Sequence, residues 1–132
     1  MTYQVGREKI KEYATALGID NPVHFDVGAA RDAGFRDVVA PPMFAVVYSM
    51  PSMAPAMFDP DVAMNFATMV HGGQTFEWGE PACSGDEITT TAKCISIQEK
   101  LGNGFYVFET TSVNGAGAEV VRGTMTNIVR GV

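Results

Sequence analysis

The sequence predicts an α+β domain in which an antiparallel sheet curls around one buried helix. The first 60 residues hold helical patterns and six of the seven prolines, whereas residues 62–130 alternate in polarity between glycine-containing turns. The segment Pro41–Met50 is apolar on nearly every face, which indicates a helix buried on all sides. Short turns between consecutive strands favour antiparallel pairing, so we expect one sheet to cover this helix.

Length and composition indicate one folded domain. The chain has 132 residues, and a domain commonly takes ~100–200. Hydrophobic residues make up 46% of the chain and charged residues 18%, which is too apolar for a disordered segment. We therefore predict a single domain over residues 1–132.

Three helices are expected in the first half. Apolar residues recur at helical spacing between Gly6 and Gly18, and Gly18 is a natural stop. A shorter helix is expected at roughly 28–33. Because proline is tolerated in the first turn of a helix, the apolar helix can begin near Pro41 or Pro42. Residues 51–61 hold three more prolines and are expected to form an irregular connection.

Four strands are expected in the second half, near 64–78, 87–99, 104–113 and 118–130. Strong turn signals separate the last three strands: Gly102-Asn103-Gly104 and the run from Asn114 to Gly117. Phe76 and Trp78, at the end of the first of these strands, are expected in the core.

Charge and cysteine content exclude several classes of protein. The net charge of −6 argues against a nucleic-acid binder and against binding to an anionic membrane surface. The apolar stretch Val38–Tyr48 is too short to span a bilayer. The N-terminus lacks the apolar region of a signal peptide. Two cysteines without metal-ligand spacing indicate reduced thiols and no metal site, so we expect a cytoplasmic protein.

A turn rich in functional groups follows Gly18. It concentrates Asp20, Asn21, His24 and Asp26. A histidine beside carboxylates can move a proton near neutral pH, because a carboxylate orients the imidazole. The spacing alone also fits a structural turn, in which Asp20 or Asn21 bonds its own backbone and His24 is a surface residue.

Six segments, in order along nearly the whole chain, resemble the MaoC-like dehydratase family. The resemblance is to its N-terminal MaoC-type (FAS1-like dehydratase) branch, which includes the mycobacterial HadA subunit. It implies a hot-dog fold: an antiparallel sheet around a long central helix, preceded by an overhanging helical segment. The six segments are Asn21–Asp26, Ala30–Phe35, Val39–Phe44, Val70–Trp78, Gly85–Ile88 and Val121–Thr124.

The resemblance also implies an activity and a set of catalytic residues. These proteins are hydro-lyases that interconvert 3-hydroxyacyl and trans-2-enoyl thioesters of coenzyme A or acyl carrier protein, with (3R) stereochemistry. Active members use an aspartate and a histidine spaced as in Asp-x-Asn-Pro-x-His. This chain keeps Asn21 and His24 but has Ile19 at the aspartate position, with Asp20 one place later. His24, Asp20 and Asn21 are therefore the catalytic candidates.

A second family feature is a backbone N–H from a His-Gly pair at the start of the central helix. Here Pro41-Pro42 replaces that pair, and proline has no N–H to donate. Met43 or Phe44, next along the helix, would have to supply the donor. We take Pro42, Met43, Phe44, His71 and Gly72 as candidate substrate-binding residues. On a strand, His71 can line the pocket, lie in a subunit interface or be structural.

These departures leave several functions open. The chain is a dehydratase or hydratase in its own right, or the substrate-binding subunit of a heterodimer with a catalytic MaoC-type partner. A non-catalytic acyl-CoA-binding module is the alternative, and the Asn-Pro-x-His motif argues against a thioesterase. A lone sheet of this kind leaves an edge uncovered, so we expect a homodimer or a heterodimer. We expect no cofactor beyond the coenzyme A or phosphopantetheine carried by the substrate.

Overall fold

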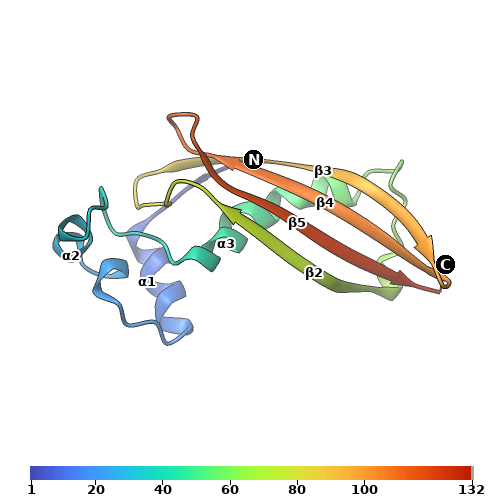
Figure 1. Cartoon of the computed structure of the whole chain (residues 1–132), viewed down its shortest axis with the longest axis horizontal. Helices are drawn as coiled ribbons and strands as arrows, with labels where there is room; N and C mark the ends of the chain where they lie inside the picture. The colour runs from blue at the N-terminus through green and yellow to red at the C-terminus, as the bar shows by residue number, and fades with distance from the viewer. Residues whose placement is uncertain (132) are drawn as a thin grey trace.

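The computed structural model describes residues 1–131, which form one five-stranded antiparallel sheet and a set of short helices (Figure 1). The strands lie in the order β1-β3-β4-β5-β2. This confirms the α+β prediction. The elements in chain order are β1 (Thr2–Gln4), α1 (Arg7–Ala16), α2 (Val27–Asp32), α3 (Ala45–Ser49), α4 (Met53–Met57), β2 (Met69–Trp78), β3 (Glu87–Lys100), β4 (Asn103–Val113) and β5 (Glu119–Arg130).

The predicted strands are confirmed with small changes at their ends. β2 begins at Met69 rather than near residue 64, because Asn65 caps a 3₁₀ turn over Phe66–Thr68. The Asn114 turn forms as expected: its side-chain oxygen accepts from the backbone N–H groups of Ala116 and Ala118, both at 3.0 Å. The short strand β1, which pairs three residues with the start of β3, was not predicted from the sequence.

The central helix is longer and less regular than expected. It runs as 3₁₀ turns at Pro42–Phe44 and Met50–Ser52 alternating with α3 and α4, so helical structure extends from Pro42 to Met57. The expectation of an irregular connection was wrong for residues 51–57. Pro51 and Pro55 each lie in the first turn of a helical piece, where a backbone N–H has no helical partner to lose.

The core forms where the concave face of the sheet meets this broken helix. One cluster packs around α3 and contains Phe44, Tyr48, Ile88 and Val121. A second cluster packs beneath α4 and is rich in methionine: Met53, Met64 and Met125 pack with Tyr106, Phe108 and Val129. The helix and the sheet bury each other's apolar faces. The prediction of a helix buried on all sides was wrong, because the sheet covers only one face and leaves Met43 48% and Met50 37% exposed.

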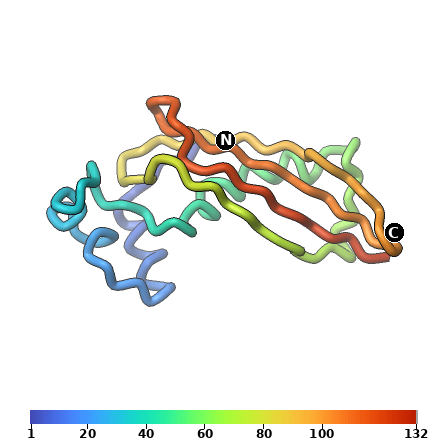
Figure 2. Tube along the Cα trace, viewed as in Figure 1, coloured from blue at the N-terminus to red at the C-terminus, as the bar shows by residue number. Residues whose placement is uncertain are grey.

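The N-terminal helical segment extends beyond the end of the sheet, as expected. Figures 1 and 2 show α1, α2 and the intervening turn projecting from the body of the domain. The segment Val38–Ala40 joins this overhang to the body. It pairs with the loop after β2: the Ala40 N–H donates to the Ala82 carbonyl and the Ser84 N–H to the Val38 carbonyl, both at 2.8 Å.

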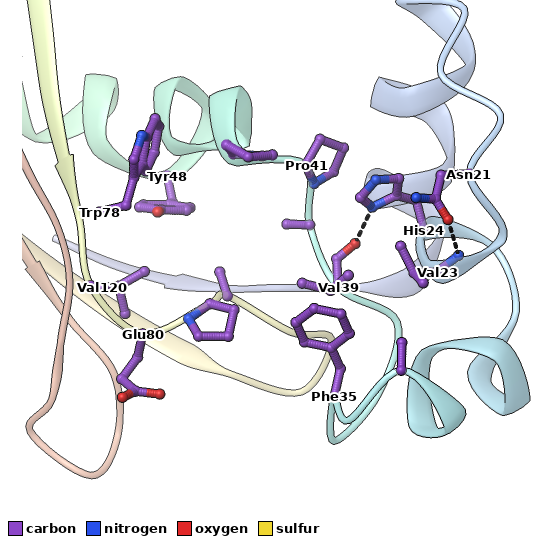
Figure 3. A pocket seen from close by; sticks show the side chains of 16 residues that line it. Asn21, Val23, His24, Phe35, Val39, Pro41, Tyr48, Trp78, Glu80 and Val120 are labelled. Atoms are coloured by element: carbon purple, nitrogen blue, oxygen red, sulfur yellow. Dashed lines mark hydrogen bonds between the residues drawn. The ribbon is translucent and has the colours of Figure 1, made fainter.

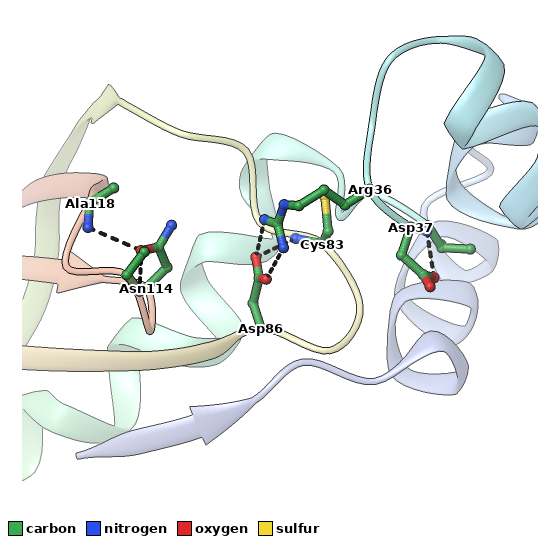
Figure 4. Close-up of polar contacts among 8 residues, drawn as sticks. Arg36, Asp37, Cys83, Asp86, Asn114 and Ala118 are labelled. Atoms are coloured by element: carbon green, nitrogen blue, oxygen red, sulfur yellow. Dashed lines mark hydrogen bonds and ion pairs between the residues drawn. The ribbon is translucent and has the colours of Figure 1, made fainter.

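An ion pair reinforces this junction (Figure 4). The Asp86 carboxylate accepts hydrogen bonds from the Arg36 guanidinium and, at 2.9 Å, from the Cys83 backbone N–H. Burial alone would raise the pKa of Asp86, but these hydrogen bonds and the charge of Arg36 outweigh it and hold the pKa below its usual value. Nearby, the Arg7 guanidinium lowers the pKa of Asp37 to about 2. The overhang is therefore held by charge as well as by backbone pairing.

No helix within residues 1–131 is both long enough and apolar enough to cross a membrane.

Candidate functional site

A cavity of about 480 Å³ lies where the overhang meets the central helix and the end of the sheet (Figure 3). The overhang contributes Asn21, His24 and Phe35, and the helix contributes Tyr48. The end of β2 contributes Trp78. Most of the remaining lining residues are valine, alanine or proline. An apolar cleft with a few polar groups is the usual form of a small-molecule site.

Asn21 and Pro22 shape the turn that carries His24. The Asn21 side-chain oxygen accepts from the Val23 N–H at 3.2 Å and caps a 3₁₀ turn over Pro22–His24. Pro22 fits the first position of that turn. The turn carries His24 inward, where it is 9% exposed and borders the cavity. The surface-histidine alternative is therefore wrong.

The backbone fixes the orientation and tautomer of His24. Its Nδ1 lies 2.7 Å from the Val39 carbonyl oxygen. A carbonyl can only accept, so Nδ1 must carry the proton. In the neutral ring, Nε2 then holds the lone pair and is free to accept a proton or a hydrogen bond.

The carboxylates of the turn lie elsewhere. Asp20 is exposed and does not border the cavity. Asp26 caps α2 and accepts from the Ala29 N–H at 2.8 Å. Within residues 1–131, Glu80 is the one acidic residue that lines the cavity, and Figure 3 shows its side chain directed away from His24. His24 therefore has no carboxylate partner in the part of the chain that the structure describes.

The start of the central helix offers few donors to a ligand. Pro41 and Pro42 line the cavity, and neither has an N–H. The Phe44 N–H donates to the Pro41 carbonyl at 2.9 Å, and its side chain is wholly buried in the core. Met43 is half-exposed and does not line the cavity. Of the helix-start candidates, the structure places only Pro42 at the site.

His71 and Gly72 lie far from this cavity. They are near the beginning of β2, and Trp78 at the other end of that strand borders the cavity. Seven residues of strand span roughly 23 Å. A Cβ on Gly72 would lie 2.7 Å from Ile128 Cδ1, so this glycine allows a close packing contact. The chain therefore does not bring these two candidates together with His24.

Several residues that line the cavity were not predicted from the sequence, and the position predicted for Trp78 was wrong. Trp78 was expected in the core, but it is 50% exposed and forms one wall of the cavity. Its ring stacks on Phe76 with the centroids 5.0 Å apart. The Gly79-Glu80-Pro81 run that follows it ends the strand, and this was the available signal that Trp78 lies at an open edge. Tyr48 and Phe35 carried no signal that distinguished them from core residues.

Candidate metal-ligating side chains do not cluster in the part of the chain that the structure describes. Across residues 1–131, no group of three or more histidine, cysteine or acidic side chains is placed to hold a metal ion. The buried Cys83 lies at the overhang junction, and burial raises the pKa of its thiol.

Sequence comparison places the chain in a family. The family model of the FAS1-like dehydratase domain region matches residues 1–122. A UPF0336 protein of Clavibacter michiganensis subsp. michiganensis is 41% identical over 129 residues, covering 98% of this chain and 87% of the relative. A UPF0336 protein of Thermobifida fusca is 36% identical over 129 residues, covering 98% of this chain and 85% of the relative.

Solved structures confirm the hot-dog fold. A MaoC-like dehydratase is 32% identical with a TM-score of 0.87; the match covers 98% of this chain but only 39% of that longer chain. A C-terminally truncated HadBC (3R-hydroxyacyl-ACP dehydratase) complex from Mycobacterium tuberculosis has a TM-score of 0.83 at 26% identity, covering 97% of this chain and 90% of that one. R-hydratase PhaJ1 from Pseudomonas aeruginosa, at 20% identity and a TM-score of 0.75, covers 100% of this chain and 79% of that one and shares the fold. This chain therefore belongs to the FAS1-like dehydratase domain family and has the hot-dog fold of MaoC-like dehydratases.

Proposed function

We propose that this chain takes part in the (3R)-specific interconversion of 3-hydroxyacyl and trans-2-enoyl thioesters, as the substrate-binding subunit of a heterodimer with a catalytic MaoC-type partner. The observation that carries the proposal is the apolar cavity in which His24 borders the ligand space without a carboxylate partner in residues 1–131. The substrate would bring its own coenzyme A or phosphopantetheine, so no further cofactor is needed.

The reaction sets three physical requirements. Dehydration removes a proton from the carbon next to the thioester carbonyl, and the departing 3-hydroxyl must be protonated. Negative charge develops on the thioester oxygen during the reaction, and hydrogen-bond donors must stabilise it. A complete site therefore needs a base, an acid and at least one well-placed donor.

This chain meets only part of these requirements. His24 has a fixed tautomer with Nε2 free, which suits a proton acceptor or a hydrogen-bonding group. Asp20 lies outside the cavity, so it does not serve as the second acid–base group. Pro42 has no N–H, the Phe44 N–H is already bonded to the Pro41 carbonyl, and Met43 does not line the cavity, so no residue of the helix start presents the expected donor to it. The missing acid and donor would come from the partner subunit.

The likeness to HadBC supports a partner of the same fold. That solved structure is a complex, and the match covers 97% of this chain. In such a heterodimer, this chain would form the acyl-binding cavity. The partner chain would supply the aspartate and histidine of an intact Asp-x-Asn-Pro-x-His motif. A homodimer of this chain would duplicate the incomplete site, which is why a heterodimer is favoured.

The test compares the chain alone with the chain co-expressed with a MaoC-type protein that has both intact motifs. Hydration of crotonyl-CoA and longer trans-2-enoyl-CoAs is followed by loss of the conjugated absorbance. We expect turnover only in the complex, at a rate above that of the partner alone. Turnover by the chain alone would overturn the subunit assignment, and no gain over the partner alone would overturn the enzymatic role.

A second candidate is a non-catalytic acyl-CoA-binding module. The two prolines at the helix start and the exposed Asp20 favour it, because they remove donors and acids without closing the cavity. Calorimetric titration with acyl-CoA separates the two functions. Binding without conversion, in the presence of every MaoC-type partner that forms a complex, would establish the module.

A further inference from the structure

Tyr48 brings an unpaired hydroxyl to the cavity. Its side chain is 3% exposed and lines the cavity, and its hydroxyl forms no hydrogen bond with any group in residues 1–131. Buried polar groups in native proteins nearly always have a partner. Within residues 1–131, two side-chain polar atoms are wholly enclosed and lack a hydrogen-bond partner: Thr68 Oγ1 and Asn127 Nδ2. The Tyr48 hydroxyl is not among them, so it is not wholly enclosed by the chain; because Tyr48 lines the cavity, we assign its hydroxyl to that space.

The surrounding structure holds the Tyr48 ring in place. Phe44 lies one helical turn earlier, and the two ring centroids are 6.2 Å apart. The Tyr48 carbonyl accepts a 3.5 Å hydrogen bond from the Thr90 hydroxyl, which ties the helix to β3. A tyrosine phenol is protonated at neutral pH and can donate, and burial raises the pKa of Tyr48 further.

Tyr48 and His24 border different ends of the cavity. Figure 3 shows His24 on the overhang side and Tyr48 beside Trp78 on the helix and sheet side. Apolar side chains, including Pro41 and Val39, line the space between them. The cavity thus offers two separated polar groups joined by an apolar stretch.

We infer that the cavity selects an acyl thioester whose acyl group carries a second hydrogen-bond acceptor, such as a keto oxygen, several carbons beyond the thioester. The thioester end lies toward His24, and the distal oxygen accepts from the Tyr48 hydroxyl. This inference rests on the proposed function, because it assumes that the ligand is an acyl thioester. A plain alkyl chain would displace water from the phenol and leave the phenol unpaired, which disfavours its binding.

The test uses Trp78, the one tryptophan of the chain, as the reporter. Because its ring borders the cavity, ligand binding should change its fluorescence. Hexanoyl-CoA is compared with 5-oxohexanoyl-CoA, and octanoyl-CoA with 7-oxooctanoyl-CoA, with calorimetry as a second readout. We expect at least one oxo ester to bind about 10-fold tighter than its plain counterpart, a typical effect of one buried hydrogen bond.

Two variants locate the source of the preference. Tyr48→Phe keeps the ring and removes only the hydroxyl, and it should bind oxo and plain esters equally. Tyr13→Phe is the matched control, since the Tyr13 ring also packs on Phe44, at 5.4 Å, but does not line the cavity. This control should keep the preference. Thermal unfolding of both variants checks that the fold is intact.

The outcomes separate this inference from the proposed function. Equal affinity of the unmodified chain for oxo and plain esters, or a preference that survives in Tyr48→Phe, overturns the inference alone. A Tyr48-dependent preference without turnover in any complex supports the inference and counts against the proposed reaction. Failure of every CoA ester to bind overturns both.

Discussion

His24 Nδ1 lies 2.7 Å from the carbonyl oxygen of Val39, and the Val39 N–H donates in turn to the Val23 carbonyl at 3.1 Å. The turn that carries the histidine is thereby bonded at two points to the segment that leads into the central helix. A backbone carbonyl orients the ring, but unlike a carboxylate it carries no charge to stabilise an imidazolium. This geometry suits a histidine that positions a ligand better than one that shuttles protons.

His24→Asn tests that distinction in the co-expressed complex. Asparagine can keep an N–H near the position of Nδ1 while removing Nε2. If the partner supplies the acid and base, KM should rise while kcat falls less than about 10-fold, short of the ~10²–10⁴-fold expected for a lost acid–base group. Steady-state kinetics with crotonyl-CoA measure both values.

His24→Ala provides the structural comparison for this variant. It leaves the Val39 carbonyl without its partner, so the free energy of unfolding should fall by about 1–3 kcal/mol. His24→Asn should lose less in the same urea titration. A collapse of kcat in a stably folded His24→Asn complex would show that His24 is an acid–base group of this reaction.

Asp86→Asn should weaken the overhang junction in a pH-dependent way. The folded-state pKa of Asp86 is held below the unfolded value, so its contribution is present above about pH 4 and is lost as the pH falls through the folded pKa. At pH 7 we expect a loss of about 1–2 kcal/mol, discounted because the Arg36 side chain is 62% exposed.

Urea denaturation at pH 7 and pH 3 measures this effect. The unmodified chain should lose more stability on acidification than Asp86→Asn does. Asp32→Asn, on the exposed end of α2, is the matched surface control and should leave the stability at pH 7 unchanged. Equal acid sensitivity of the unmodified chain and Asp86→Asn would show that the ion pair does not stabilise the junction.

Strand alternation and turn residues were enough to predict four of the five strands, because a sheet with one buried face imposes a period of two on its sequence. The three residues of β1 are too few to show that period. Prolines at 51 and 55 led to the prediction of an irregular connection, yet each falls where a helix can begin again. The effect of a proline on a helix depends on its position within the helical turn, and local sequence alone does not give that position.

The site was only partly predictable, for a different reason. The Asn-Pro-x-His spacing led to His24 because a local turn fixes that side chain. Tyr48 and Trp78 line the cavity because the helix, the overhang and the end of β2 pack together there. These contacts join segments far apart in the sequence, so no local sequence pattern predicts them. Asp20 shows the converse: it is next to the motif in sequence and is not a lining residue of the cavity.

The two cysteines should differ sharply in reactivity. Cys83 is 1% exposed and burial raises the pKa of its thiol, whereas Cys94 is partly exposed on β3. Since the thiolate is the reactive form, a thiol reagent at pH 8 should modify one cysteine quickly in the folded chain and two in urea. Intact mass spectrometry counts the modified sites.

Cys94→Ser identifies the fast thiol. The folded variant should react slowly, because Cys83 lies where the Val38–Ala40 segment pairs with the loop after β2. Rapid modification of Cys83 in this variant would show instead that the junction opens readily and that the overhang is not rigidly attached.

Gly79→Ala should disturb the cavity wall directly. A Cβ at this position would lie 2.1 Å from the Glu119 carbonyl oxygen, and a backbone atom cannot move aside as a side chain can. The Gly79 N–H also donates to the Val120 carbonyl at 2.8 Å, which fixes the chain between Trp78 and Glu80. We expect a loss of about 1–3 kcal/mol in the free energy of unfolding.

Gly73→Ala, on the strand β2 that Gly79 directly follows, is the matched control, because a Cβ there meets nothing within 4 Å. It should leave stability unchanged or raise it slightly, since alanine reduces the freedom of the unfolded chain. Titration of both variants with octanoyl-CoA, followed by Trp78 fluorescence, separates stability from binding. Weaker binding by folded Gly79→Ala, but not by Gly73→Ala, would assign the Trp78 wall to the ligand site. Equal binding by both would remove that wall from the site.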